Sequence, residues 1–444
     1  MTIDTFGQQL RKRQVSAEQV TEECLARIEK EDGRLNSFIT VMAEDARRQA
    51  RRADAELAAG RDCGPLHGVP ISIKDLLDVQ GLPTTAASRV REGHVAARDA
   101  PTIAHLKRAG AVLIGKTNLH EFAFGTTNED SAFGPARNPF DPSRSPGGSS
   151  GGSGASVAAG FALATIGTDT GGSIRIPAAA CGLVGLKPTL GEVSVEGVVP
   201  LSHTLDHVGP LTTSVSDASA VYRALLGDGN SKPLTPIPLA GVRLGVLRSY
   251  FCDLLDEEVR ASFERALENL RAAGVQTSEI EIPHAKDIAT VYLHLVLADA
   301  AAYHATTLDS MPDRYTEPVR LRLEMGRYIL AEDYVRARAG RELLRREVDA
   351  ALAQHDALIL PTLAILPPLI GQETSRFGDR TEPVRNVMLR LTQLFNITGH
   401  PALSIPAAPG PSGLPCGVQL VGWHSQTDAL LRVGLACEPH ITGP

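Results

Sequence analysis

The chain has 444 residues, of which 43% are hydrophobic and 21% charged, and this apolar fraction supports a large buried core and excludes wholesale disorder. The formal net charge of -7 gives no general electrostatic footprint for DNA or RNA. The amino terminus has no apolar signal-peptide core, and no run of about 18 strongly apolar residues predicts a membrane span. We therefore expect a cytoplasmic protein that binds neither nucleic acid nor a membrane.

Six cysteines are spread over the whole chain without a CxxC pair, and no cysteine–histidine cluster has the spacing of zinc ligands. In a cytoplasmic protein such cysteines are usually reduced residues of the core. We therefore expect no disulfide and no metal site.

The first sixty residues predict helices, the first of them capped by Ser16. Alternating apolar residues in the segment 65–75 predict a short strand that ends at Lys74. A helix over 100–110 and a buried strand over 111–115 follow, and this alternation of helix and strand predicts an α/β fold.

The second half of the chain continues this pattern, and a proline-rich connection over 233–240 precedes it. We expect a strand over 241–247, a helix over 256–273, arginine-rich helices over 280–355, a strand over 358–362, a loop to about residue 380, and a final strand and helix. We see no repeat and no convincing linker, so the sequence predicts one domain over residues 1–444.

Two segments match known motifs, but the residues in or before each segment do not fit the structure that the motif requires. Residues 110–117 match the phosphate-binding pattern GxxxxGK[ST], but the residues between the two glycines form a buried strand that cannot cradle a phosphate. Residues 147–151 match the GxSxG nucleophile elbow, but prolines and charges precede them where an apolar strand is required.

Two glycine-rich segments are better candidates for chemistry. Residues 145–154 lead directly into an apolar run of small residues, which favours close backbone packing over a flexible linker. Further on, the successive backbone N–H groups of Thr170, Gly171, Gly172 and Ser173 can converge and hold a developing oxyanion. The Ser173 hydroxyl then lies where it can attack the carbonyl, although an ordinary glycine-rich turn has the same composition.

A serine nucleophile needs a base, and Lys74 is the first candidate. Burial lowers the pKa of a lysine and makes it a usable base, so a Ser–Lys arrangement can replace Ser–His–Asp. His203 and His207, on either side of Asp206, are rival bases that residue spacing alone does not separate from Lys74.

Taken together, these segments resemble the amidase signature family, the serine hydrolases with a Ser–cis-Ser–Lys triad. The resemblance covers nearly the whole chain and keeps the family's motif order. It rests on HGVPISIKD (67–75), GAVLIGKTNLHEFAFG (110–125), RNPFDPSRSPGGSSGGSGASVAAG (137–160), GTDTGGSIRIPAAACGLVGLKPT (167–189), LDHVGPL (205–211) and LFNITGHPALSIPAA (394–408).

The resemblance implies an α/β amidase signature fold, in which a large mixed twisted sheet has helices on both faces. It implies a catalytic core of about 60–230, with a variable helical and loop region of about 280–385 covering the substrate pocket. It also implies site roles: Ser173 as nucleophile, Ser149 as the bridging serine with a cis peptide bond, Lys74 as base, the N–H groups of Thr170, Gly171, Gly172 and Ser173 as oxyanion hole, and Ser150, Asp169 and Arg175 as supporting residues.

The implied activity is hydrolysis of the C–N bond of a small linear or aryl amide, or of a carbamate or urea-like compound, through an acyl-enzyme and without cofactor or metal. The alternative is a glutaminase subunit of the amidotransferase A type, which needs partner chains. Relatives of that type hold the glutamine ammonium group with an acidic residue, and residues 386–408 contain no Asp or Glu. We therefore expect poor hydrolysis of glutamine and better turnover of uncharged or aryl amides.

The partner implied for the site is a small-molecule amide, and a homodimer is an allowed assembly that the sequence does not determine. Substrate choice is expected to lie in the region 280–385. Its arginine-rich part, 314–346, is interpreted as solvated helix surface. The same part can alternatively supply an arginine that binds a carboxylate.

Overall fold

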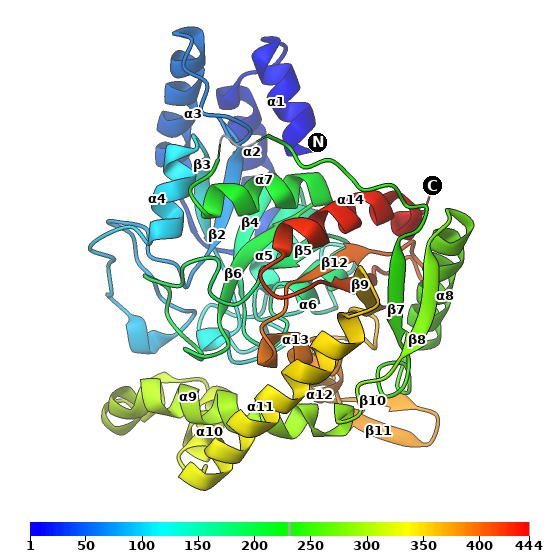
Figure 1. The fold of residues 1–444 in the computed structure, drawn as a ribbon. Helices are drawn as coiled ribbons and strands as arrows, with labels where there is room; N and C mark the ends of the chain where they lie inside the picture. Colours follow the sequence, from blue (N-terminus) through cyan, green and yellow to red (C-terminus); the bar gives the residue numbers. More distant parts are fainter. Residues whose placement is uncertain (230–231, 444) are drawn as a thin grey trace.

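A computed structural model describes residues 1–229 and 232–443. The predicted end of the catalytic core at about residue 230 and the last residue of the predicted domain therefore lie outside the described residues. An eleven-stranded sheet of order β1-β3-β2-β4-β6-β5-β12-β13-β9-β7-β8 crosses the molecule (Figure 1). A separate two-stranded ribbon is formed by β10 and β11.

The sheet is mixed. β2 runs parallel to both β3 and β4, and β7 runs parallel to both β8 and β9, whereas the other pairs are antiparallel. The strands are β1 (Phe38–Val41), β2 (Pro70–Lys74), β3 (Val112–Thr117), β4 (Ala164–Asp169), β5 (Val184–Lys187), β6 (His207–Thr212), β7 (Arg243–Leu247), β8 (Gln276–Ile280), β9 (Ala357–Pro361), β10 (Thr374–Phe377), β11 (Arg380–Pro383), β12 (Ala402–Pro406) and β13 (Gly417–Val421).

Helices separate most of these strands along the chain. They are α1 (Ile3–Arg11), α2 (Ala17–Leu35), α3 (Ala43–Ala58), α4 (Pro101–Arg108), α5 (Gly151–Ala158), α6 (Arg175–Ala180), α7 (Val215–Leu225), α8 (Glu257–Ala272), α9 (Ile288–Ser310), α10 (Glu317–Gly326), α11 (Ala331–Leu352), α12 (Val384–Leu389), α13 (Gln393–Ile397) and α14 (Thr427–Thr442).

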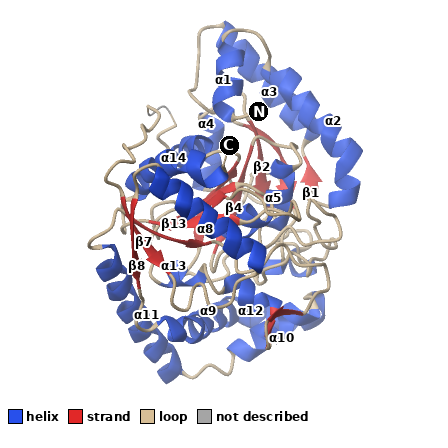
Figure 2. Cartoon of the chain, turned by 90° about the vertical axis from the view of Figure 1, so that its right-hand side faces the viewer, coloured by secondary structure: helices blue, strands red, loops and turns tan. Residues whose placement is uncertain are grey.

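Helices cover both faces of the sheet, as Figure 2 shows from the side. On β12, the Leu403 side chain packs against Gly434 of α14, whereas the Ser404 hydroxyl lies on the side of Ala179 in α6. Successive residues of a strand point to opposite faces, so α14 and α6 lie on opposite sides of the sheet. The predicted α/β class with a large mixed sheet is therefore confirmed.

The helices α9, α10 and α11 pack together at the end of the molecule opposite α1–α3 (Figure 1). Within the described residues, one helical stretch, Ala285–Ser310, is long and apolar enough to cross a membrane by length and composition alone. Half of its most apolar window, 50%, is buried inside the protein, and core helices commonly pass the same test. Packing against α10, α11 and α13 accounts for its composition.

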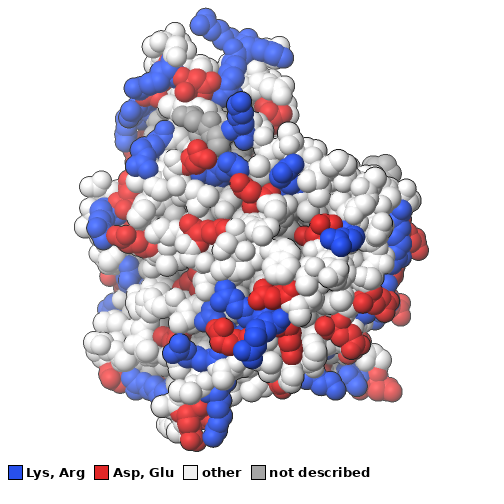
Figure 3. Space-filling view, viewed as in Figure 1, with Lys and Arg blue, Asp and Glu red and all other residues white. Residues whose placement is uncertain are grey.

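Charges of both signs are interspersed on the face seen in Figure 3, over the α11 region as well as over α1–α3. This distribution agrees with the near balance of 44 basic and 51 acidic residues. On this face the described residues form no continuous basic stripe.

Several local predictions agree with the structure. Ser16 caps α2 by accepting a hydrogen bond from the Gln19 N–H, and residues 112–117 are a strand and not a phosphate loop. All six cysteines are free, and Cys63 alone is not fully buried.

A group of possible metal ligands, Glu56, Cys63 and His67, lies within 4.8 Å, but its donor atoms are already in use. His67 bonds the backbone of Ala53 and Cys63, and Glu56 pairs with arginines. The absence of a metal site stays a prediction.

Two elements differ from the expectation. The loop expected up to about residue 380 contains the β10–β11 ribbon, and the glycine-rich segment 145–154 ends in α5. Glycine disfavours helix, so tertiary packing decides here. A Cβ on Gly152 would lie 2.5 Å from the carbonyl oxygens of Asn118 and Ser37, which means that α5 packs directly on neighbouring backbone.

This packing generates a prediction for a matched pair of helix glycines. Gly152→Ala should lower the free energy of unfolding by about 1–3 kcal/mol, because the backbone atoms it would meet cannot move aside. Gly33→Ala in α2 should raise it by about 0.5–1 kcal/mol, because a Cβ there meets nothing within 4 Å. Urea unfolding measures both, and equal changes of the same sign would contradict the packing of α5.

Candidate active site

Lys74 ends β2, beside the parallel strand β4, and its amine is enclosed by hydroxyl groups. The Nζ atom donates hydrogen bonds of 2.8 Å to Ser149 Oγ, Ser150 Oγ and Thr168 Oγ1, and all four side chains are buried. The carboxyl ends of parallel neighbours meet at one edge of a sheet, which is why Lys74 and Thr168 lie side by side.

These surroundings bring the pKa of the Lys74 amine close to neutral pH. Burial lowers the pKa of Lys74 to about 7, although the more distant charges of Asp169 and Asp206 act to raise it. Among the described residues Lys74 forms no ion pair. A substantial fraction of Lys74 is thus uncharged at neutral pH and able to accept a proton.

Ser149 sits on a backbone turn just before α5. The Gly148–Ser149 peptide bond is cis, and the Ser149 carbonyl accepts a hydrogen bond of 3.0 Å from the backbone N–H of His120. The next hydroxyl, that of Ser150, donates to the Thr168 carbonyl at 3.2 Å. This turn is therefore fixed on both sides, and it directs the two hydroxyls at the same lysine amine.

Ser173 lies on the loop that leaves β4 and enters α6, and it keeps 5% of its surface exposed, whereas Lys74 and Ser149 have none. The backbone N–H groups of Thr170, Gly171, Gly172 and Ser173 make no hydrogen bond among the described residues. A buried N–H group normally has a partner, so four free donors on one loop suit an anionic ligand.

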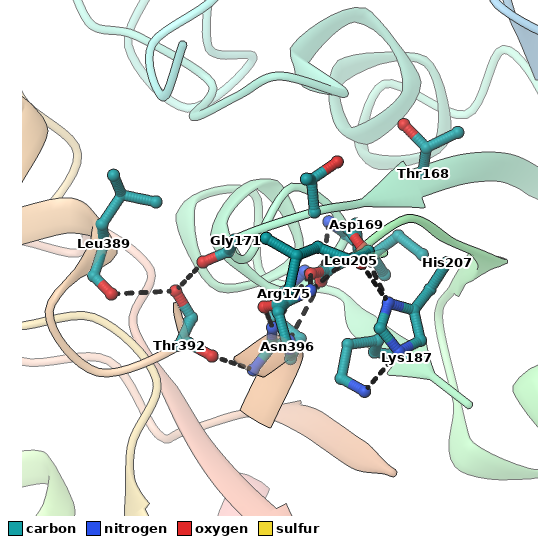
Figure 4. A network of polar contacts seen from close by, with 12 residues as sticks. Thr168, Asp169, Gly171, Arg175, Lys187, Leu205, His207, Leu389, Thr392 and Asn396 are labelled. Carbon is teal, nitrogen blue, oxygen red and sulfur yellow. Dashed lines mark hydrogen bonds and ion pairs between the residues drawn. The ribbon is translucent and has the colours of Figure 1, made fainter. Parts of the chain in front are cut away.

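The shape of this loop depends on glycine and on Thr392. Gly172 has a φ of +141°, and a Cβ there would lie 2.3 Å from Thr392 Oγ1. The same Oγ1 donates to the Gly171 carbonyl at 2.6 Å, as Figure 4 shows. Thr392 therefore turns the carbonyl of Gly171 away while the loop's N–H groups remain free.

An ion pair anchors both ends of the loop. Arg175 binds both carboxylate oxygens of Asp169, at 2.9 and 3.0 Å, and both side chains are fully buried (Figure 4). Asn396 contacts both members of the pair. Burial alone would raise the pKa of Asp169, but the Arg175 guanidinium holds it well below its usual range. Asp169 therefore stays charged and committed to Arg175.

Asp206 braces the loop from another side. It accepts hydrogen bonds from the Thr170 hydroxyl at 2.6 Å and from the N–H groups of Leu201 and Ser202. Burial raises the pKa of Asp206 to about 6. These contacts show that Asp206 positions Thr170, and its carboxylate oxygens are occupied by these donors.

The histidines considered as rival bases do not contact the serines. His207 is buried, and its Nδ1 donates to the carbonyls of Leu205 and Asp169 while Nε2 lies 3.2 Å from Lys187 Nζ (Figure 4). His203 is exposed, and its ring lies edge-on to Tyr303.

The structure thus brings Lys74, Ser149 and Ser150 into direct contact and places Ser173, Asp169 and Arg175 on the loop after the adjacent strand. Sequence reasoning missed three residues that hold this arrangement: Thr168, Thr392 and Asn396. Thr168 and Asn396 lie inside motifs that were recognised, next to Asp169 and in LFNITGHPALSIPAA. Thr392 precedes that motif and carries no local signal.

Comparison with known proteins gives the family. A family model described as Amidase matches residues 19–431. The glutamyl-tRNA(Gln) amidotransferase A subunit of Koribacter versatilis (strain Ellin345) is 37% identical over 478 residues, covering 99% of this chain and 98% of the relative. An amidase of Pseudomonas putida is 39% identical over 456 residues, covering 100% and 96%. A solved structure described as an amidase superposes with a TM-score of 0.94 at 38% identity, covering 99% of this chain and 100% of the other. The chain belongs to the amidase signature family.

Proposed function

We propose that this chain is a serine amidohydrolase in which Ser173 is the nucleophile, Ser149 relays protons and Lys74 is the base. The observation that carries the proposal is the buried amine of Lys74, which contacts Ser149 at 2.8 Å and has a pKa of about 7. A base with a pKa near the working pH transfers protons most effectively.

In the first half of the reaction, the Ser173 oxygen forms a bond to the amide carbon while its proton passes to Ser149 and the Ser149 proton passes to neutral Lys74. The free N–H groups of residues 170–173 stabilise the oxyanion that forms. The C–N bond then breaks, and the leaving nitrogen takes a proton from Ser149, which is replenished from the Lys74 ammonium.

In the second half, water attacks the acyl-enzyme and gives its proton to the same relay. The ester bond to Ser173 breaks, Ser173 regains a proton, and the carboxylic acid product leaves. No step uses a cofactor or a metal, and Ser150 and Thr168 hold the Lys74 amine in place throughout.

The glutaminase role within an amidotransferase is the second candidate, because relatives with that name cover nearly the whole chain. The site itself favours a hydrolase of other amides. Leu389 lies against Gly171, and the surrounding segment 386–408 has no carboxylate for the glutamine ammonium group. We propose that the chain acts without partner subunits. In that case the assembly is a homodimer in the cytoplasm.

The nucleophile assignment predicts the outcome of covalent labelling. The purified wild-type chain should react with a fluorophosphonate at Ser173, and Ser173→Ala should abolish labelling and turnover while the melting temperature stays close to that of the wild type. Peptide mass spectrometry identifies the modified residue. Label found on Ser149 in either protein would show that the roles of the two serines are wrong.

The base assignment predicts the pH dependence. Because Lys74 must be neutral and has a lowered pKa, turnover should rise with pH through about 7 and then level off. Lys74→Ala should lose several orders of magnitude in kcat, whereas His203→Ala and His207→Gln should keep the activity and the inflection. A folded His207→Gln protein without activity would instead support the histidine base.

A further inference from the structure

A second polar cluster lies beside the nucleophile loop and takes no part in the reaction described above. Tyr292 of α9 packs on the loop, since a Cβ on Gly171 would lie 2.3 Å from its hydroxyl oxygen and 3.0 Å from Leu389 Cδ2. Leu389 ends α12, and Figure 4 shows its carbonyl linked through Thr392 to Gly171. One side of the site is therefore built by α9 and α12.

Arg385, in the first turn of α12, brings a guanidinium group to this side of the site without a partner. Its Nε atom is buried and has no hydrogen-bond partner, and among the described residues the side chain forms no ion pair. Its charge acts on the phenol of Tyr292, where it opposes the burial that raises the Tyr292 pKa. Arg385 as a residue is partly exposed, but a guanidinium whose Nε is buried without a partner is costly to leave unpaired and calls for an anion.

A second guanidinium, that of Arg322 in α10, lies close by. Its Nη1 donates a hydrogen bond to the Phe124 carbonyl at 2.7 Å. Among the described residues, Arg322 forms one ion pair, with Asp130 at 3.9 Å. Asp130 is shared with His120, 3.0 Å away, and burial lowers the pKa of that histidine. Burial and the positive charge of Arg385 lower the pKa of Arg322 to about 10. Arg322 and Arg385 thus repel each other, and Asp130 compensates them only in part.

A neighbouring arginine on the same segment is held by contacts with the fold, although its Nε, like that of Arg385, is buried without a hydrogen-bond partner. Arg390 donates to the Tyr250 carbonyl at 2.8 Å and stacks on the Tyr250 ring at 3.7 Å. Arg385 has neither kind of contact among the described residues. Because the whole Arg385 guanidinium, and not its Nε alone, lacks such contacts among the described residues, the side chain points to a ligand and not to bracing of the fold.

We propose that Arg385, with Tyr292 and Arg322, forms a subsite for a carboxylate on the acyl part of the substrate, so that the preferred substrates are monoamides of dicarboxylic acids. The inference rests on the proposed function. A bidentate carboxylate satisfies the Arg385 fork and supplies the missing negative charge. Because segment 386–408 offers no carboxylate, the substrate carries no ammonium group beside its acid.

This subsite changes two expectations from the sequence. Arg322 belongs to the arginine-rich segment 314–346, yet its side chain is only 22% exposed, so that segment is not uniformly solvated surface. The expected substrates also change, from uncharged and aryl amides to amides whose acyl chain ends in a carboxylic acid. Glutamine remains a poor substrate, because its ammonium group would lie beside two arginines.

The test compares glutaramate, the monoamide of glutaric acid, with 5-methylhexanamide, in which an isopropyl group replaces the carboxylate, and with glutamine. The wild type should hydrolyse glutaramate with the highest kcat/KM. Arg385→Gln should lower kcat/KM for glutaramate about 10- to 100-fold, mainly through KM, as expected for one charge-assisted contact. Its kcat/KM for the neutral amide should stay within about threefold, Arg385→Lys should recover part of the loss, and the exposed Arg380→Gln should behave as wild type.

Two further readouts separate this subsite from the proposed catalytic function. Fluorophosphonate labelling of Ser173 should persist in Arg385→Gln, which reports on the catalytic groups alone. Glutarate should raise the melting temperature of Ser173→Ala but not of the Ser173→Ala/Arg385→Gln double variant. A wild type that prefers the neutral amide, an equal loss on both amides, or a glutarate shift that survives without Arg385 would each overturn the subsite, whereas failure of labelling in the wild type would overturn the catalytic proposal.

Discussion

A primary amine that is enclosed by protein and surrounded by hydroxyl groups is the interaction on which the proposed chemistry depends. Lys74 has no exposed surface and contacts three hydroxyl oxygens but no carboxylate among the described residues. A charged ammonium group is poorly stabilised there, and its pKa falls. The catalytic base is thus produced by the hydroxyl groups around the lysine and by the lack of a contacting carboxylate among the described residues.

The buried pair Asp169–Arg175 contributes to this result from a distance. Asp169 directly follows Thr168, a partner of Lys74, and a free carboxylate at that position would stabilise the ammonium form. Arg175 binds both carboxylate oxygens, and neither oxygen contacts Lys74, although the Asp169 charge still acts to raise the pKa of Lys74. The same pair ties the two ends of the loop 169–175, and one ion pair therefore serves both the electrostatics and the shape of the site.

The sequence predicted the parts of this protein that are encoded locally. The strand ending at Lys74, the Ser16 cap and the buried strand over 111–115 follow from periodicity and capping, and the family motifs identify Ser149 and Ser173 as candidates. The β10–β11 ribbon was missed although its two strands pair across a tight local turn, and the glycine-rich start of α5 was missed because packing on neighbouring backbone outweighs the local propensity of glycine. Thr392 was missed for a related reason: it contacts Gly171 from more than 200 positions along the chain, and no local pattern reveals that contact.

The central claim, that Lys74 is the neutral base, is tested most directly by titrating its amine in the folded protein. NMR spectra of the chain labelled at the lysine side chains, compared with those of Lys74→Met, assign the Lys74 signal. We predict that this signal titrates near pH 7, whereas the exposed lysines titrate near their usual value of about 10.4. A Lys74 signal that stays in the charged form up to pH 10 would contradict the claim.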